Sequence, residues 1–299
     1  MQQLPAAGSL SASGGSWIPK AASPADGPHM TRDFARVYEL TGNRVTAPVA
    51  TEALRRAGPV GAGTRLLDIG AGAGALSIPA AYSGASVLAI DIAPGMVELL
   101  TERLAPFPRA KTSVMDGEDL QLADGCFDLA FSIFGVSLFA DWRKGLREQY
   151  RVLTPGGKAS VATWKTPLGG GPFVVMARAL RDVFPSQTPP SAPEAFVVLS
   201  DQERFATEMR AAGFSKVDVV EVDAVWQGPA GHAYLEELHE LHRYMAPYAI
   251  LKADDQRKVD DAIVQLIGKF TVDGEVRIDS PALIAMGTKM GTKIGTKEG

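Results

Sequence analysis

The feature that most constrains this chain is a glycine-rich turn that joins two short apolar segments. Residues 66–69 read Leu-Leu-Asp-Ile, residues 70–74 read Gly-Ala-Gly-Ala-Gly, and the apolar segment 87–90 is followed directly by Asp91. Short apolar runs are typical of buried parallel strands, and a backbone that turns sharply and approaches a ligand closely favours glycine. The sequence therefore predicts a strand, a ligand-binding turn and a second strand that ends in a carboxylate.

The turn and Asp91 together predict a site for an adenosine. A helix that begins near Ala75 would point its free N–H groups at the ligand, and a carboxylate at a strand tip can accept hydrogen bonds from both ribose hydroxyls. Gly70, Gly72 and Ala75, with an acidic residue about 20 positions further on, also satisfy the dinucleotide fingerprint in its G/A form. The motif alone therefore leaves two classes of cofactor open.

Two further acidic positions favour S-adenosylmethionine over a dinucleotide. Asp68 precedes the first glycine, where a carboxylate attracts the cationic amino group of a methionine moiety and repels a pyrophosphate. A second acidic turn, residues 115–119, follows the predicted strand 110–114, and a carboxylate there suits the exocyclic amine of adenine. We therefore expect Asp68, Asp91 and Asp116 to contact the cofactor.

Five segments carry a resemblance to a known family: residues 66–74, 91–96, 116–120, 127–132 and 151–158. Their order and spacing across residues 38–164 are similar to those of the class I S-adenosylmethionine-dependent methyltransferases, in particular the small-molecule group related to the quinone C-methyltransferases. The resemblance implies transfer of a methyl group from S-adenosylmethionine to a small-molecule O-, N- or C-nucleophile. It implies an in-line displacement that is catalysed mainly by positioning.

The resemblance also implies a set of cofactor-binding residues. Met96 is expected to pack on adenine or in the core, and Phe134 is expected to lie beside the sulfonium or in the core. The full set comprises Asp68, Gly70, Ala71, Gly72 and Gly74, then Asp91, Ile92 and Met96, then Asp116, Gly117 and Glu118, and finally Ser132 and Phe134.

The chain offers few candidates for a catalytic base. Tyr38 lies upstream of the turn, where members of the family fold an aromatic helix over the methionine end of the cofactor. His239 and His242 lie in His-Glu-Leu-His on a predicted helix, but the position four after His239 is Arg243, so the zinc pattern His-Glu-x-x-His is absent. We interpret both histidines as structural, with a general base as the alternative, and we expect no metal site.

Alternating strands and helices predict an α/β fold with helices on both faces of a parallel sheet. The resemblance implies that this fold is of the Rossmann-like class I methyltransferase type, with a mostly parallel sheet. The resemblance implies seven strands in the order 3-2-1-4-5-7-6, with the ligand at the carboxyl ends where the order reverses. Strands are expected at residues 65–69, 86–90, 110–114, 127–133, 157–164, 216–223 and 281–287, and helices at residues 32–57, 173–184, 201–212, 230–245 and 254–270.

Residues 31–289 are expected to form one methyltransferase domain. Within it, residues 165–200, with a loop composition, and residues 227–279, with two inserted helices, are expected to form the lid that selects the substrate. Residues 1–30 are rich in Ala, Gly, Ser and Pro and predict a disordered leader. Residues 290–299 continue a Gly-Thr-Lys repeat and predict a disordered tail.

Composition excludes several other classes. The net charge of −4 provides no basic surface for nucleic acid, and the single Cys126 excludes an internal disulfide framework. No apolar run approaches the ~18 residues that span a bilayer. We expect a cytoplasmic enzyme that acts on a small-molecule acceptor, without a nucleic-acid partner or a membrane span. A dinucleotide-dependent oxidoreductase and a non-catalytic protein that keeps the cofactor fold are the alternatives.

Overall fold

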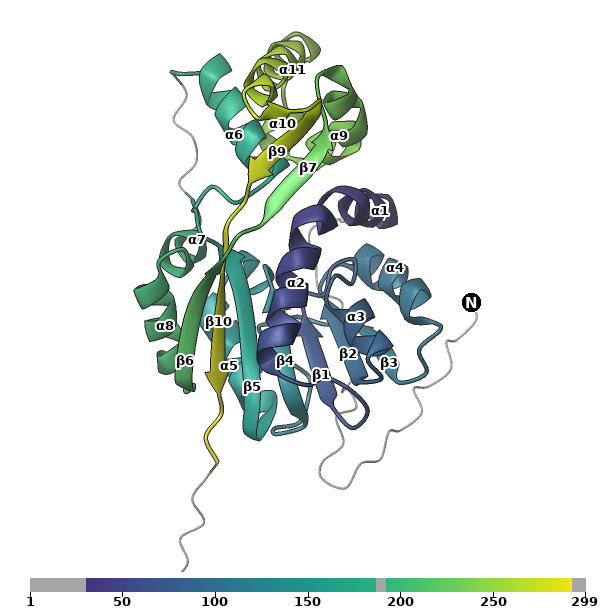
Figure 1. The fold of residues 1–299 in the computed structure, drawn as a ribbon, viewed down its shortest axis with the longest axis vertical. Coiled ribbons are helices and arrows are strands. Elements are labelled where there is room, and N and C mark those ends of the chain that lie inside the picture. The colour runs from purple at the N-terminus through teal and green to yellow at the C-terminus, as the bar shows by residue number, and fades with distance from the viewer. Residues whose placement is uncertain (1–30, 187–191, 292–299) are drawn as a thin grey trace, which may run out of the picture.

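A computed structural model of the chain describes residues 31–186 and 192–291. Disorder is expected for residues 1–30 and 290–299. Of these, residues 1–30 and 292–299 lie outside the described residues. The described part folds as a sheet covered by helices, which we call the body, and a second, smaller unit beyond one end of that sheet (Figure 1).

The body is built on a seven-stranded sheet with the order β3-β2-β1-β4-β5-β10-β6. The first five of these strands pair in parallel, and β10 runs antiparallel to both of its neighbours, which confirms the expected order and direction. The strands are β1 (Arg65–Ile69), β2 (Ser86–Asp91), β3 (Ala110–Val114), β4 (Phe127–Ile133), β5 (Leu153–Trp164), β6 (Ser215–Val222) and β10 (Ala282–Thr288).

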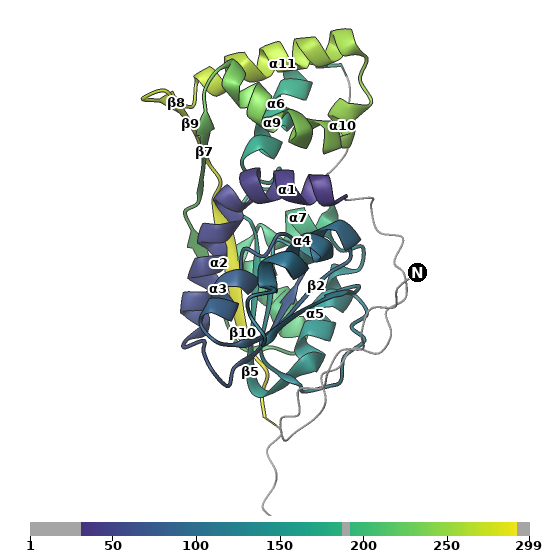
Figure 2. The same ribbon diagram turned by 90° about the vertical axis from the view of Figure 1, so that its right-hand side faces the viewer.

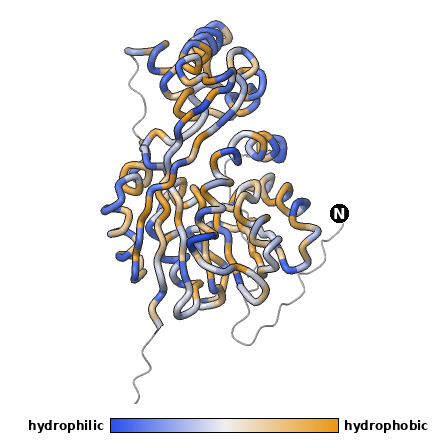
Figure 3. The backbone as a smooth tube through the Cα atoms, in the orientation of Figure 1, coloured by the Kyte–Doolittle hydropathy of each residue, from blue (hydrophilic) through white to orange (hydrophobic). Residues whose placement is uncertain are grey.

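Helices cover both faces of this sheet because successive strand residues point to opposite sides. Leu66 packs in one apolar cluster and Leu67 in the other. Figure 3 shows hydrophobic residues concentrated along these strands, as burial on two faces requires. The Leu66 side is covered by α2 (Asn43–Ala57), α3 (Ser77–Tyr82) and α4 (Pro94–Leu104), and the Leu67 side by α5 (Trp142–Val152), α7 (Glu194–Leu199) and α8 (Gln202–Ala211).

The smaller unit, which we call the lid, consists of residues 172–183 and 225–279. The insertion holds the two expected helices, and it also holds an antiparallel sheet, in the order β7-β9-β8, that was not expected. The signal for β9 was present, because Val276 and Ile278 alternate with charged residues and are buried. The lid elements are α6 (Pro172–Val183), β7 (Val225–Pro229), α9 (His232–Tyr244), α10 (Ala246–Ala249), α11 (Ala253–Gly268), β8 (Thr271–Val272) and β9 (Glu275–Asp279).

Two other helical expectations need correction. The single helix expected at residues 32–57 is broken into α1 (Arg32–Thr41) and α2 by Gly42, where a Cβ would lie 2.7 Å from the ring of Tyr38. The segment 165–200 was expected to be loop on either side of its one helix, but it also contains α7, whose Val198 and Leu199 are buried in the body. Apolar burial therefore overrode the proline-rich composition around α7.

Ser280 joins three of the chain connections that run between the body and the lid. Its hydroxyl accepts a 2.8 Å hydrogen bond from the Gly171 amide, directly before α6, and donates to the Ile278 carbonyl at 3.0 Å. Its own amide donates to the Ala224 carbonyl at 2.7 Å, directly before β7. Ser280 is only 1% exposed, so water does not compete for these hydrogen bonds. This junction fixes where the lid begins relative to the strand ends.

Candidate active site

The glycine turn after β1 has a left-handed backbone at alternate residues. Gly70, Gly72 and Gly74 have φ values of +68°, +52° and +91°. At Gly74 an added Cβ would lie 2.5 Å from Leu100 of α4, and the φ of +91° disfavours any other residue. At Gly72 the nearest atom to an added Cβ is 3.9 Å away, on the ring of Tyr38. Gly72 therefore leaves space at the surface of the turn that a ligand can use.

Asp91, at the end of β2, holds this turn in place. Its Oδ2 accepts a 2.9 Å hydrogen bond from the Gly72 amide, and its Oδ1 accepts one of 2.9 Å from the Ala93 amide. Burial raises the pKa of Asp91, and the amides of Ala93 and Gly72 oppose that shift. A carboxylate has about four acceptor sites, so each oxygen retains capacity for a ribose hydroxyl.

Asp68, in β1, is a buried carboxylate with a neutral partner. It is 2% exposed and accepts a 2.5 Å hydrogen bond from the Ser77 hydroxyl at the start of α3. Burial raises its pKa to about 7, with a smaller contribution from the negative charge of Asp91. A cation beside Asp68 would stabilise its charged form. The sequence analysis did not single out Ser77, although a hydroxyl soon after a glycine turn is a detectable signal.

Tyr38 on α1 lies over the turn, packed between the Gly42 and Gly72 positions. Burial raises the pKa of Tyr38 to about 12, and the charge of Asp91 adds to the shift. The phenol is therefore protonated at neutral pH and is a poor candidate for a catalytic base. It can donate a hydrogen bond and cover the ligand.

Helix α1 is held between the body and the lid, as Figure 2 shows. On the body side, ion pairs join Glu39 to Arg103 and Arg32 to Glu102 of α4. On the lid side, the indole N–H of Trp226 in β7 donates a 3.0 Å hydrogen bond to the Thr41 carbonyl at the end of α1. The helix that carries Tyr38 is thus fixed to both parts of the molecule.

The acidic turn after β3 is organised by its own side chains. Asp116 Oδ1 accepts a 2.8 Å hydrogen bond from the Glu118 amide, and Glu118 Oε1 accepts one of 2.7 Å from the Ala140 amide. A Cβ at Gly117 would lie 2.5 Å from the Phe139 ring, so Gly117 is required for packing. Among the predicted adenine contacts, the Glu118 carboxylate is therefore committed to the loop that follows β4, whereas Asp116 keeps one oxygen available.

The end of β4 combines a backbone clamp with a stacked aromatic pair. Ser132 Oγ donates to the Ile69 carbonyl at 2.9 Å and accepts from the Val136 amide at 3.1 Å, so its side chain ties β4 to β1. Phe134 has φ +62°, a backbone conformation that is strained for an L-residue. Its ring stacks on Trp164 with 4.1 Å between centroids. Strain of this kind, held by the surrounding structure, is frequent at functional sites.

The remaining predicted contacts lie beside Asp91 and in the turn. Met96 on α4 is 4% exposed within the core, and Ala71 is 8% exposed, with its amide bonded to the Ile90 carbonyl. Ile92 is partly buried. The structure therefore brings the predicted cofactor residues together at the carboxyl ends of β1, β2, β3 and β4.

The two histidines lie apart from the turn, on α9 of the lid (Figure 1). His239 is exposed and contacts Glu240. His242 is 2% exposed and packs between the rings of Tyr234 and Tyr248. Burial lowers the pKa of His242 to about 4, so it is neutral at physiological pH. In the described ranges, no group of three or more His, Cys, Asp or Glu side chains is arranged to hold a metal ion.

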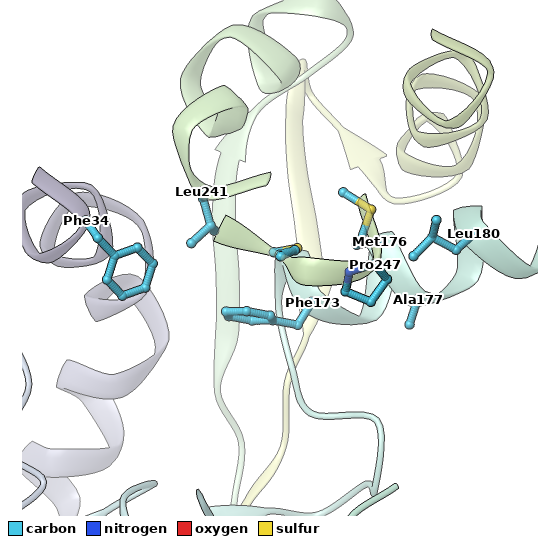
Figure 4. A pocket seen from close by; sticks show the side chains of 8 residues that line it. Phe34, Phe173, Met176, Ala177, Leu180, Leu241 and Pro247 are labelled. Atoms are coloured by element: carbon cyan, nitrogen blue, oxygen red, sulfur yellow. The ribbon is translucent and has the colours of Figure 1, made fainter. Parts of the chain in front are cut away.

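An apolar pocket of about 280 Å³ lies between α1 and the lid (Figure 4). Its walls come from segments far apart in the chain, which the fold brings together. It is lined by Phe34 of α1, by Phe173, Met176, Ala177 and Leu180 of α6, and by Leu241, Met245 and Pro247 from α9 and α10.

The residues at the strand ends fit S-adenosylmethionine. Gly72 leaves room at the turn, Asp91 has spare acceptor capacity for a ribose, and Asp68 is a buried carboxylate that a cationic amino group would stabilise. The same Asp68 charge would oppose the pyrophosphate of a dinucleotide.

Comparison with known proteins shows the family to which the chain belongs. A family model described as a methyltransferase domain matches residues 67–161. A demethylmenaquinone methyltransferase of Clavibacter sepedonicus is 35% identical over 197 residues, which cover 61% of this chain and 74% of that one. The chain belongs to the class I S-adenosylmethionine-dependent methyltransferases. It transfers a methyl group from S-adenosylmethionine to a small-molecule acceptor.

Solved structures share the fold at low sequence identity. The YcgJ protein of Bacillus subtilis aligns with a TM-score of 0.53 at 18% identity and covers 81% of this chain and 98% of that one. A Haemonchus contortus phosphoethanolamine N-methyltransferase, solved with phosphomonomethylethanolamine and S-adenosylhomocysteine, aligns with a TM-score of 0.54 at 19% identity. That match covers 92% of this chain but 62% of the other, so the chain spans less than two thirds of that relative.

The described residues contain no helix that is both long enough and apolar enough to cross a membrane.

Proposed function

We propose that the carboxyl ends of β1 to β4 hold S-adenosylmethionine and that the methyl acceptor reaches it from the lid side. The observation that carries the proposal is the Asp91 carboxylate, which fixes the open Gly72 position through one amide and still has acceptor sites for a ribose. A turn and a ribose acceptor joined in this way present one preformed surface to an adenosine.

Each part of the cofactor has a proposed partner. Asp91 accepts hydrogen bonds from the ribose, and Asp68 stabilises the cationic amino group. Asp116, with the backbone of Gly117 and Glu118, contacts the adenine beside Ile92 and Met96. The Phe134 ring and the Ser132 carbonyl face the sulfonium, because aromatic faces and carbonyl oxygens both attract positive charge. The backbone of residues 70–74 surrounds the methionine end, which Tyr38 covers.

The bound cofactor supplies a methyl group that is already activated as a sulfonium. The nucleophilic atom of the acceptor forms a bond to the methyl carbon while the carbon–sulfur bond breaks. The sulfur keeps the electron pair, and a proton that the methylated acceptor loses passes to bulk water after the product leaves the site. The protein therefore contributes position and exclusion of water, with the nucleophile about 3 to 3.5 Å from the methyl carbon. Tyr38 and the lid provide that enclosure.

Release of S-adenosylhomocysteine with a panel of quinols, phenols, amines and small carboxylic acids tests the proposal. We expect product with at least one acceptor class, and we expect Asp91→Asn to lower the initial rate at subsaturating cofactor. The control, Asp279→Asn, changes an exposed carboxylate in β9. Equal rates in wild type and Asp91→Asn would contradict the assigned role of Asp91.

Partners and location follow from the same proposal. The acceptor is a small molecule rather than a nucleic acid, which the net charge of −4 supports. A cytoplasmic location remains a prediction, which fractionation of the cells that make the protein would test.

A further inference from the structure

The apolar pocket between α1 and the lid carries an inference about the acceptor, and this inference rests on the proposed function. We propose that the pocket binds the methyl acceptor, and that the acceptor is a compact, uncharged molecule with an apolar body and one nucleophilic polar atom. The pocket measures about 280 Å³, and all eight residues that line it are apolar. Figure 4 shows Phe34 on one side, apart from the other labelled lining residues, which belong to the lid.

One wall of the pocket leads directly to the proposed cofactor site. Phe34 lies one helical turn before Tyr38 on α1, and their ring centroids are 6.0 Å apart. Tyr38 in turn lies over Gly72 of the glycine turn. Helix α1 therefore lines the pocket at one turn and covers the glycine turn at the next, which links the pocket to the proposed site for the methionine end of the cofactor.

A second wall connects the pocket to the end of β4. Phe173 is the second residue of α6 and follows shortly after Gly170, where an added Cβ would lie 2.4 Å from the Trp164 ring. Trp164 stacks on Phe134, which we have placed beside the sulfonium. Contacts from the two walls therefore lead to the glycine turn after β1 and to the end of β4, where we have placed the methyl group.

The chemistry of the lining selects against charged acceptors. A carboxylate or phosphate in the pocket would lose its water without gaining a partner from the lining residues, and that loss is large for an ion. The aromatic rings suit a flat apolar body, and the flexible Met176 and Met245 adapt to its shape. The volume lies just below the usual range of about 300 to 1,000 Å³ for ligand pockets, which favours a compact molecule.

Fluorescence of N-phenyl-1-naphthylamine, an uncharged apolar probe, tests the pocket. We expect saturable binding with one site per chain, in the presence of S-adenosylhomocysteine, and displacement by 1-naphthol. Ala177→Trp fills the pocket, and we expect it to lower the affinity of the protein for the probe by at least about tenfold. The control, Val272→Trp, adds the same side chain at an exposed position of β8 and is expected to bind the probe as wild type does.

Charge selectivity is the second test. We expect 1-naphthol to displace the probe at a concentration at least about tenfold lower than 1-naphthoate. Probe binding that Ala177→Trp leaves unchanged, the absence of saturable binding, or preferential displacement by 1-naphthoate would each overturn the inference.

Calorimetry with S-adenosylmethionine separates this inference from the proposed function. Wild type and Ala177→Trp are expected to bind the cofactor equally, because Ala177 lines only the pocket. If wild type and Ala177→Trp both bind the cofactor but the probe does not bind as expected, the assignment of the pocket to the acceptor is wrong and the proposed cofactor site stands. If neither binds the cofactor, the proposed function fails first.

Discussion

The backbone amide of Gly72 donates a 2.9 Å hydrogen bond to Oδ2 of Asp91, so the carboxylate at the end of β2 determines the shape of the turn after β1. The sequence led us to expect contact with the cofactor at Asp91. The structure shows that this carboxylate also supports the fold, because it is 9% exposed and binds two backbone amides. Substitutions at Asp91 therefore act on cofactor binding and on stability together.

Asp91→Asn is expected to weaken S-adenosylmethionine binding by about 1.5 to 3 kcal/mol, the usual value of a hydrogen bond to a charged group. It is also expected to lower the melting temperature, because one backbone amide loses its acceptor and the other keeps only a neutral one. Calorimetric titration and differential scanning calorimetry measure the two effects, with Asp279→Asn as the control. A variant with unchanged cofactor affinity would show that Asp91 serves the turn alone.

Asp68 is expected to make cofactor binding depend on pH. Its pKa of about 7 means that part of the ligand-free protein holds a proton there at neutral pH, and a cationic amino group would displace that proton. Affinity should therefore rise between about pH 6 and pH 7.5, where the amino group of the cofactor is still largely protonated. Titration at several pH values measures this, and Asp68→Asn should bind more weakly and with a flatter profile. Equal slopes in the two proteins would argue against Asp68 as the partner of the amino group.

Asp68 is expected to make the free energy of unfolding fall as pH rises, whereas it makes cofactor affinity rise. The folded protein holds the Asp68 proton up to about pH 7, whereas the unfolded chain releases it near the ordinary aspartate pKa of 3.8. The folded state thus binds more protons between these values, and the contribution of Asp68 to the free energy of unfolding falls as pH rises through that window. Denaturant titrations of wild type and Asp68→Asn should differ in slope in that direction.

Much of the body could be predicted because its signals are local. Short apolar runs located the strands of the large sheet, with ends within one residue except at β5. That strand begins at Leu153, four residues before the expected start. The expected start was placed too late because Pro155 and Gly156 have turn composition. The break between α1 and α2 was missed because Gly42 itself has a helical backbone, with φ −69° and ψ −40°.

The pocket could not have been read from the sequence. Phe34 and Leu241 line the same space from helices about two hundred positions apart, and only the packed lid brings them together. The small lid sheet was missed for a different reason, since β8 has two residues and β7 ends in Gly228 and Pro229, which usually mark turns.

Ser280→Ala is expected to loosen the junction between the body and the lid. The substitution leaves the buried Gly171 amide without its acceptor, which costs about 1 to 3 kcal/mol of folding free energy. Hydrogen exchange should increase most at residues 169–173 and 278–281, while the amides of β1 and β2 keep their protection. The conservative Ser280→Thr retains the hydroxyl and serves as the comparison. Uniform loss of protection across the body would show that Ser280 supports the whole fold rather than the junction.

Tyr38 is expected to act through its ring and not as a base. Tyr38→Phe keeps the cover over Gly72, so its affinity for the cofactor should stay within about threefold of wild type, whereas Tyr38→Ala should lose about tenfold. With a pKa of about 12, the phenol should add no break to the rate profile between about pH 7 and pH 9. A break in wild type that disappears in Tyr38→Phe would assign proton transfer to this residue.

Calorimetric titration of the wild-type protein with S-adenosylmethionine, and separately with NADH, tests the central claim most directly. The buried Asp68 carboxylate and the Asp91 carboxylate at the turn suit a ligand with a cationic amino group and a ribose, and they oppose a pyrophosphate. We predict saturable heat with S-adenosylmethionine at one site per chain and none with NADH. Saturable binding of NADH, with no heat from S-adenosylmethionine on folded protein, would contradict the account.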